Sequence, residues 1–160
     1  MPLTTPTSDA HSTTHATFTI ERHFAAPPAR VFRAFADPEA KRRWFGGEAD
    51  RWTPELREMD FRAGGAERAR GRWHTGVVSD FRAVYHDIIA DDRIVYVYDM
   101  YVNDRKLSVS LATIQLHRDG AGTRMVLTEQ GVFFDGLDAA SSREAGTKFL
   151  MDALERSLAE

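Results

Sequence analysis

The run of six strand-like segments in the middle of the chain limits the fold more than any other feature of the sequence. Each segment is rich in β-branched and aromatic residues, and Gly, Asp or Asn turn residues separate it from the next one. The segments are residues 56–63, 66–74, 79–89, 93–102, 105–118 and 123–133. The sequence therefore predicts a meander of strands joined by short turns.

The residues before the meander predict one more strand and two short helices. Over residues 16–24 mostly apolar residues alternate with polar ones, as in a half-buried strand. Pro28 stands at the first position of a short amphipathic helix, where its fixed φ is already helical. Asp37 is the expected N-cap of a second helix, which Gly46 and Gly47 close.

A long amphipathic helix is expected after the meander, from about Asp138, which is its expected N-cap. Its apolar stripe follows the 3.6-residue period, and charged residues repeat at i, i+4 on the other side. The stripe comprises Ser142, Ala145, Gly146, Phe149, Leu150, Ala153, Leu154 and Leu158. Gly146, which has no side chain, is expected to let a bulky group or a backbone approach closely.

The first hairpin of the meander allows a prediction of register. An odd loop of residues 64–66 places Asp60 opposite Arg70 and Glu58 opposite Arg72, whereas a two-residue loop sets apolar residues beside the arginines. Cross-strand charge pairs contribute about 0.2–1 kcal/mol each. A strand also keeps its apolar residues on one face, so the sequence favours the odd loop.

Composition indicates one ordinary globular domain. The chain has 160 residues, of which 42% are hydrophobic and 28% charged, and the predicted domain covers residues 16–160 after a Ser-, Thr- and Pro-rich flexible tail at residues 1–15. The 21 basic and 24 acidic residues give a net charge of −3, which argues against a dedicated nucleic-acid-binding protein. The absence of cysteine excludes disulfides, thiolate nucleophiles and zinc or iron–sulfur sites with Cys ligands.

The sequence also bears on location. It has no uncharged apolar run near the roughly 20 residues that cross a bilayer. The first basic residue is Arg22, so no charged n-region precedes an apolar stretch as in a signal peptide. We therefore expect no membrane insertion and a cytoplasmic location.

Several short motifs resemble those of one known superfamily. They are residues 27–35 (PPARVFRAF), 37–39 (DPE), 44–45 (WF), 60–65 (DFRAGG), 94–96 (IVY) and 122–128 (GTRMVLT). With this order of elements, residues 18–158 resemble the START-like (SRPBCC) superfamily. Within it they are most similar to the AHSA-type branch, named for the activator of the ninety-kilodalton heat-shock protein's ATPase. That branch usually has proline where this chain has Ala63.

The resemblance implies an α+β helix-grip fold. In this fold a curved antiparallel sheet of about seven strands wraps around a long C-terminal helix, two short helices follow the first strand, and a cavity remains between sheet and helix. Superfamily members include lipid and hormone carriers, polyketide cyclases, antibiotic-sequestering proteins and co-chaperone domains, so the fold by itself does not select a function.

Aromatic residues are plentiful enough to line such a cavity, and they could equally fill the core. The candidates are Trp44, Phe45, Trp73, Phe81, Tyr85, Tyr96, Tyr98, Met100, Phe133 and Phe149. A buried tyrosine hydroxyl needs a hydrogen-bond partner and can bond to a ligand instead. Tyr85, Tyr96 and Tyr98 are therefore the expected polar contacts.

Two acidic residues within the strands are further candidates. Glu129 lies in phase with Met125, Leu127 and Phe133, and a carboxylate on an apolar face is costly unless it is paired. It could orient a polar ligand group, act as an acid or base, or form a salt bridge. Asp99 lies on a strand whose two faces are both apolar, so the sequence does not decide to which side of the sheet its side chain points.

Other chemistry finds no support in the sequence. His23, His74, His86 and His117 are scattered without metal-ligand spacing, so no metal site and no cofactor are predicted. No GxSxG, P-loop or GxGxxG motif occurs. The basic residues could contact an acidic partner, but nearby acids can neutralise them, so a solvated face is predicted. These residues are Lys41, Arg42, Arg43, Arg68, Arg70 and Arg72.

The leading functional hypothesis is a non-enzymatic, or only incidentally catalytic, binder of a small apolar or aromatic molecule. Its expected site lies between the sheet and the C-terminal helix, with Glu129 and the tyrosines as polar contacts. Two alternatives are a co-chaperone-like activator of a heat-shock ATPase and a cyclase or dehydratase acting on a polyketide-like substrate. The edge strands could also support a homodimer.

Overall fold

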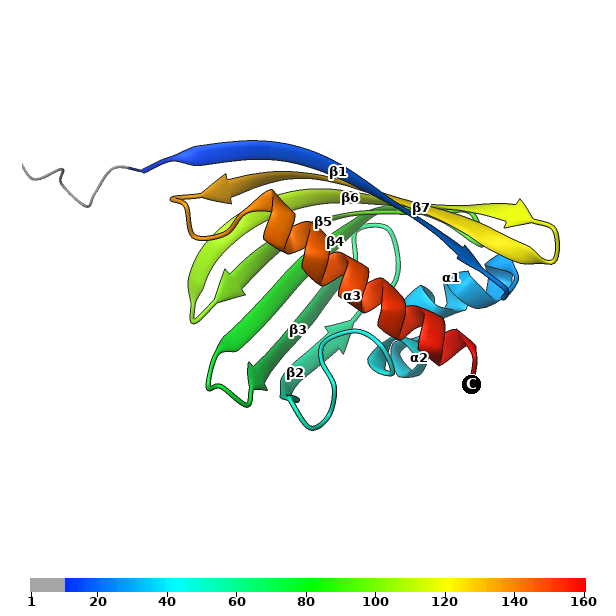
Figure 1. Ribbon diagram of the computed structural model, residues 1–160, viewed down its shortest axis with the longest axis horizontal. Helices are drawn as coiled ribbons and strands as arrows, with labels where there is room; N and C mark the ends of the chain where they lie inside the picture. The colour runs from blue at the N-terminus through cyan, green and yellow to red at the C-terminus, as the bar shows by residue number, and fades with distance from the viewer. Residues whose placement is uncertain (1–10) are drawn as a thin grey trace, which may run out of the picture.

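A single curved sheet organises the molecule. The computed structural model describes residues 11–160, and all its strands pair antiparallel in the order β1-β7-β6-β5-β4-β3-β2 (Figure 1). The strands are β1 (Thr13–Phe24), β2 (Trp52–Met59), β3 (Ala66–Trp73), β4 (Val78–Ile89), β5 (Arg93–Val102), β6 (Arg105–Asp119) and β7 (Gly122–Phe134). The predicted α+β helix-grip fold is confirmed.

Strand β1 begins earlier than the sequence predicts, because Thr13 to His15 pair with the last residues of β7. The first ten residues of the predicted tail lie outside the described residues. Strand β2 likewise begins at Trp52 rather than at residue 56. Pro54 is tolerated there because β2 is an edge strand, where a missing N–H breaks no ladder bond on the open side.

Two short helices follow β1 as predicted, α1 (Pro28–Ala36) and α2 (Pro38–Arg42). Pro28 occupies the first turn of α1, and the Asp37 carboxylate accepts a hydrogen bond from the Glu39 N–H of α2, as an N-cap does. Helix α2 ends at Arg42, before Gly46.

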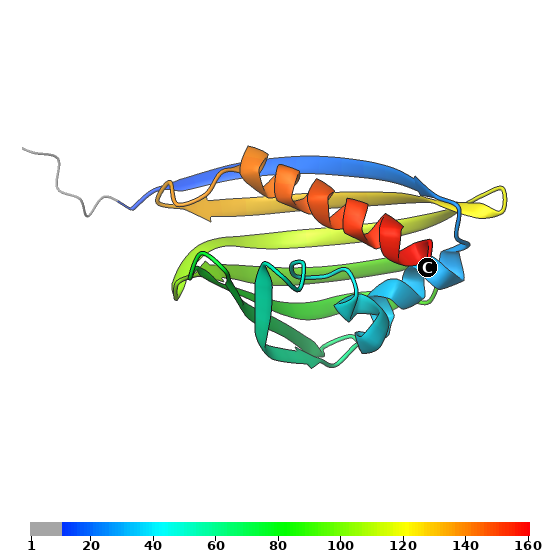
Figure 2. The same ribbon diagram turned by 60° about the horizontal axis from the view of Figure 1, so that its bottom comes forward.

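The long helix α3 (Ala140–Leu158) runs across the concave face of the sheet (Figures 1 and 2). The predicted N-cap is wrong: Ala139 is the N-cap, and the Asp138 carboxylate instead binds the Ala139 N–H and the Arg143 guanidinium. Only the C-terminal half of α3 packs tightly, with Met151, Leu154 and Leu158 buried.

The N-terminal half of α3 departs from the predicted stripe. Ala145, Gly146 and Phe149 are exposed, and the predicted close approach at Gly146 is wrong, because a Cβ added there would meet no atom within 4 Å. The main core instead gathers around the C-terminal half of α3, α1 and the central strands, with Val31, Ile94, Ile114, Met125 and Leu154 among its most buried residues. The space left under the other half of α3 is where the candidate site lies.

The predicted register of the first hairpin is wrong. Glu58 pairs with Arg68 rather than Arg72, and Asp60 lies outside the ladder. The cause is the connection after Met59, which docks on β4: the Gly64 N–H donates to the Tyr85 carbonyl at 2.8 Å. The shift is by four residues, an even number, so Glu58 still shares a face with the arginines of β3.

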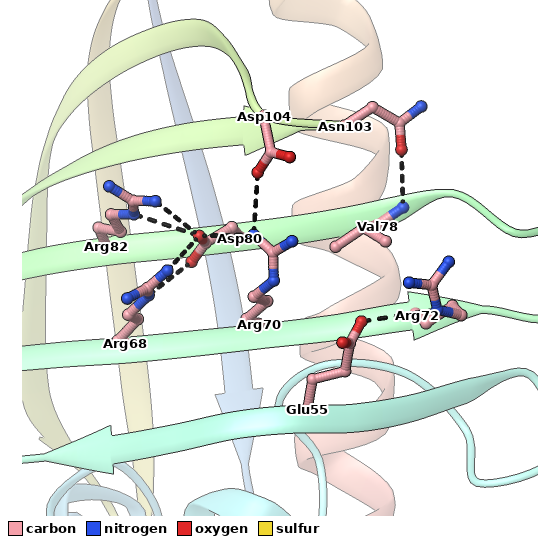
Figure 3. A network of polar contacts seen from close by, with 9 residues as sticks. All are labelled: Glu55, Arg68, Arg70, Arg72, Val78, Asp80, Arg82, Asn103 and Asp104. Atoms are coloured by element: carbon pink, nitrogen blue, oxygen red, sulfur yellow. Dashed lines mark hydrogen bonds and ion pairs between the residues drawn. The ribbon is translucent and has the colours of Figure 1, made fainter.

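On the convex face, opposite α3, one buried carboxylate holds three guanidinium groups (Figure 3). Asp80 is 1% exposed and accepts hydrogen bonds from Arg68 at 2.9 Å, Arg82 at 2.9 Å and Arg70 at 3.3 Å. Arg70 also binds Asp104, at 3.1 Å. The predicted neutralisation therefore occurs for Arg68 and Arg70, but through acids of β4 and the β5–β6 turn. Arg72 pairs with Glu55 of β2, at 3.6 Å.

Replacing Asp80 with asparagine should lower the free energy of unfolding by about 1–3 kcal/mol, a figure already reduced for the partial exposure of the arginines. Burial alone would raise the pKa of Asp80, but the hydrogen bonds from Arg68 and Arg82 outweigh it and hold the pKa below its usual value. A carboxyl with a lowered folded-state pKa stabilises the fold above its unfolded pKa, about 3.9, and loses that effect as pH falls further.

Denaturant unfolding of the wild type and Asp80→Asn at pH 7 and near pH 3 checks this. The difference between the two proteins should be full at pH 7 and should shrink in acid. Asp104→Asn is the matched control, because the Asp104 side chain is 76% exposed. A difference that stays constant down to pH 3 would contradict the role given to Asp80.

Candidate ligand cavity

A cavity of about 420 Å³ lies between the concave face of the sheet and α3. Its floor comes from β3, β4, β5 and β7, one side from the residues after α2, and its roof from α3 between Ser142 and Met151. The side chains that form most of its apolar wall are Trp44, Phe45, Trp52, Trp73, Phe81 and Met100. A volume of this order is typical of sites that hold a small organic ligand.

Strand alternation explains how the floor is built. Tyr96, Tyr98 and Met100 are spaced two apart on β5, so all three point to the concave face. Ala69 of β3 also lines the cavity, and Ala112 of β6 is fully buried beside the tyrosines. The small side chain of Ala69 leaves cavity space that a larger one would fill.

Two indole rings at the far wall are held by one hydroxyl. The Trp52 and Trp73 N–H groups donate to the Ser79 oxygen, at 3.4 Å and 3.2 Å. Trp52 packs flat on β3 because Gly71 has no side chain: a Cβ there would lie 1.9 Å from the indole. The apolar wall is therefore fixed in position by specific contacts.

A buried polar cluster forms the opposite end of the cavity. The Tyr98 hydroxyl donates to the Glu129 carboxylate, which is 3% exposed. Arg143 of α3 donates to the same Tyr98 oxygen at 2.9 Å, and its guanidinium lies 3.7 Å from Glu129. The cluster therefore joins β5, β7 and α3 through three side chains.

Arg143 is also held by groups outside that triangle. It donates to Ser108 at 2.8 Å and to Asp138 at 3.0 Å. Its guanidinium lies over the rings of Tyr98 and Phe133, 5.6 Å and 5.4 Å from their centroids. These contacts fix the guanidinium in the cavity wall.

The environment shifts the protonation of this cluster. Burial raises the pKa of Glu129 above its usual value, although the Tyr98 hydrogen bond and the Arg143 charge favour the ionised carboxylate. Burial and the negative charge of Glu129 raise the pKa of Tyr98, so its hydroxyl keeps its proton. Glu129 therefore exchanges a proton closer to neutral pH than an exposed glutamate does.

Tyr96 differs from Tyr85 and Tyr98, whose hydroxyls donate to buried carboxylates. Its hydroxyl has no hydrogen-bond partner among residues 11–160, although the ring lines the cavity. Burial, followed by repulsion from Glu129, raises the pKa of Tyr96, so this hydroxyl is also neutral. It is available to a bound molecule.

Comparison with known proteins agrees with this architecture. The sequence profile of the family described as Activator of Hsp90 ATPase homolog 1-like protein matches residues 25–159. The chain belongs to this family. No functionally curated protein matches the chain.

Solved structures of similar proteins agree with the AHSA1-like assignment. An uncharacterised protein from Rhizobium leguminosarum is 42% identical, with 93% of this chain and 97% of that one covered and a TM-score of 0.88. A protein from Rhizobium loti is 43% identical, with 91% and 99% covered and a TM-score of 0.83. An AHSA1-like protein from Aeromonas hydrophila, 21% identical over 89% of this chain and 92% of its own, shares the fold with a TM-score of 0.68.

Most of the site residues predicted from the sequence meet at the cavity of this AHSA1-like domain. Those that line it are Trp44, Phe45, Trp73, Phe81, Tyr96, Tyr98, Met100, Glu129 and Phe149. Phe133 does not line it and lies instead against the Arg143 guanidinium. Asp99, whose facing the sequence leaves open, forms an ion pair with Lys106 at 3.0 Å.

Tyr85 also lies outside the cavity, in a second buried cluster of the AHSA1-like domain. Its hydroxyl donates to Glu67, and Lys41 of α2 binds the same carboxylate at 2.6 Å. The Lys41 ammonium lies 4.5 Å from the centroid of the Phe45 ring. Lys41 is 7% exposed, so the predicted solvated face is wrong for this residue, which instead anchors α2 to the sheet.

Among the cavity residues that the sequence prediction missed, three carry an indole or a charged group: Trp52, Asp138 and Arg143. Trp52 was hidden because Pro54 interrupts its strand pattern. The sequence predicts Asp138 only as a helix cap, and Arg143 precedes Glu144 in a helix, which is the pattern of a solvated face. Their roles depend on the curvature of the sheet.

Within residues 11–160, no group of three or more His, Asp or Glu side chains could hold a metal ion. No helix of that part of the chain is long and apolar enough to cross a membrane.

Proposed function

We propose that this protein binds a small apolar or aromatic molecule in the cavity between the sheet and α3. The observation that carries the proposal is the cavity itself: about 420 Å³ of space walled by aromatic side chains, with a few polar groups at one end. A chain under no demand for this space would gain stability by filling it with a larger side chain at Ala69, which lines the cavity.

Native mass spectrometry on protein purified gently from its own host tests the proposal. A stoichiometric adduct that is released on denaturation supports binding and identifies the ligand class. If a compound supplied to the protein is recovered lighter by one water, a dehydration step of the cyclase or dehydratase type is added. Protein that is bare under all gentle conditions, and that takes up no compound from a host extract, would contradict the proposal.

A blocking substitution at Gly146 gives an independent check. Gly146 lines the cavity, and a side chain added there enters open space, so Gly146→Phe should occupy the cavity without disturbing the core. We expect at least a tenfold weaker affinity for the identified ligand, or loss of the native adduct, with little change in stability.

Ala145→Phe is the matched control, because Ala145 is the adjacent exposed residue of the same helix and does not line the cavity. This variant should keep the adduct. Equal binding by the wild type and by Gly146→Phe, measured by titration calorimetry, would place the ligand elsewhere.

A further inference from the structure

The cavity offers no free positive charge to a ligand. Arg143 is the one Lys or Arg among the described residues that line it. The guanidinium already donates to Tyr98, Ser108 and Asp138, at 2.9, 2.8 and 3.0 Å. Three of its five N–H groups are engaged in this way, and the charge is already shared by two carboxyl groups, Glu129 and Asp138. An incoming carboxylate would therefore compete with these two groups for the same cation.

The charge balance at the polar end of the cavity also disfavours a negatively charged ligand. Two carboxyl groups, Glu129 and Asp138, face one guanidinium, Arg143. The formal charges of these three groups add up to −1 when Glu129 is ionised and to zero when it is protonated. In neither state does the site compensate an additional buried negative charge, which is costly to desolvate without a partner.

Tyr96 and Glu129 together offer a hydrogen-bonding position to a ligand. Tyr96 pairs with Ala112 across β5 and β6, and Ala112 pairs with Glu129 across β6 and β7, so the phenol and the carboxyl flank a small residue on the concave face. The Tyr96 hydroxyl has no partner within the described part of the chain, and Glu129 is a hydrogen-bond acceptor. A ligand hydroxyl could accept from Tyr96 and donate to Glu129.

We propose that the ligand is a neutral aromatic or alicyclic molecule with a hydroxyl group at its polar end, bound between Tyr96 and Glu129, and that carboxylate-bearing analogues are rejected. This inference rests on the proposed function and adds the chemical class. A hydroxyl satisfies both groups, whereas a carboxylate cannot donate and would lie beside Glu129 and Asp138.

Three probes that share one ring system test the inference: 2-naphthol, 2-naphthoate and naphthalene, titrated at pH 7.5 and followed by calorimetry and by amide shifts of residues in β5 and α3. We expect 2-naphthol to bind at least about tenfold more tightly than 2-naphthoate and several-fold more tightly than naphthalene. Equal or tighter binding of 2-naphthoate would overturn the inference and leave the proposed function intact.

Two tyrosine variants localise the effect. Tyr96→Phe should reduce the preference for 2-naphthol over naphthalene and leave naphthalene affinity unchanged, because the apolar wall is intact. Tyr85→Phe is the matched control: it removes a phenol that binds Glu67 outside the cavity, so the preference should persist. A preference unchanged in Tyr96→Phe would overturn the assigned position of the hydroxyl.

The probes also separate this inference from the function on which it rests. If none of the three shifts a cavity residue up to its solubility limit and the protein from its host is bare, the proposed function fails and the inference with it. If a native adduct is found and proves to be an acid, only the inference fails.

Discussion

Lys41→Met should lower the free energy of unfolding by about 3–5 kcal/mol, because removing one partner of a buried ion pair leaves the other charge uncompensated. The side chains of Lys41 and Glu67 are 9% and 5% exposed, and their charged atoms lie 2.6 Å apart. Urea denaturation at pH 7 measures the effect. The double variant Lys41→Met/Glu67→Gln should recover part of the loss, since the amide can still accept from Tyr85.

The neighbouring residue in α2 provides a matched control. Arg42 carries the same charge, its side chain is 57% exposed, and its contact with Glu39 spans 3.4 Å at the surface. Arg42→Met should change stability by no more than about 0.5 kcal/mol. A loss in Lys41→Met no larger than that of Arg42→Met would contradict the anchoring role.

Arg143→Met should destabilise the fold by a similar amount, about 3–5 kcal/mol at neutral pH. It leaves Glu129 and Asp138 without their common cation and Ser108 without its donor, while the methionine keeps the apolar length of the side chain. Its cation–π contacts with Tyr98 and Phe133 are lost as well.

The loss of stability in Arg143→Met should increase as the pH rises. The Arg143 charge opposes the rise that burial causes in the pKa of Glu129, so removing it raises that pKa further. A carboxyl with a raised folded-state pKa contributes stability below its unfolded pKa and loses it as pH rises through the folded value. The destabilisation should therefore be larger at pH 8 than at pH 5.

Unfolding of wild type and variant at both pH values measures this difference. Lys148→Met is the matched control on the same helix, because its side chain is 54% exposed and pairs with Glu144 at the surface. The control should show little loss at either pH. A loss in Arg143→Met that is equal at pH 5 and pH 8 would indicate that Glu129 does not carry the unpaired charge.

The strands were predictable because alternation is a local property. Tyr96, Tyr98 and Met100 share a face whatever the rest of the chain does, and their meeting with Phe81 follows from the pairing of β4 with β5. Glu129 was recognisable for the same reason, as a carboxyl in phase with apolar neighbours. The aromatic wall of the site could therefore be derived from periodicity.

The polar cluster could not be derived in this way. Whether Arg143 faces Glu129 or solvent depends on where α3 lies against the curved sheet. The residues near Arg143 in the helix do not determine that position. The register of the first hairpin failed for a related reason: the bond from Gly64 to the Tyr85 carbonyl extends the connection, and it joins segments that are distant in sequence.

The order of the strands has a consequence for how the chain reaches its native state. Strand β1 finds its partner only in β7, with Phe24 opposite Thr123 and Thr13 opposite Phe134, so roughly a hundred residues emerge from the ribosome before the pair can form. The hairpins from β2 to β7 close short loops and should form sooner, whereas contacts of such long sequence separation are slow. Helix α3 follows β7, so the roof of the cavity is synthesised after the whole sheet. A molecule that binds there, as proposed, can stabilise the finished protein but cannot template the early steps of folding.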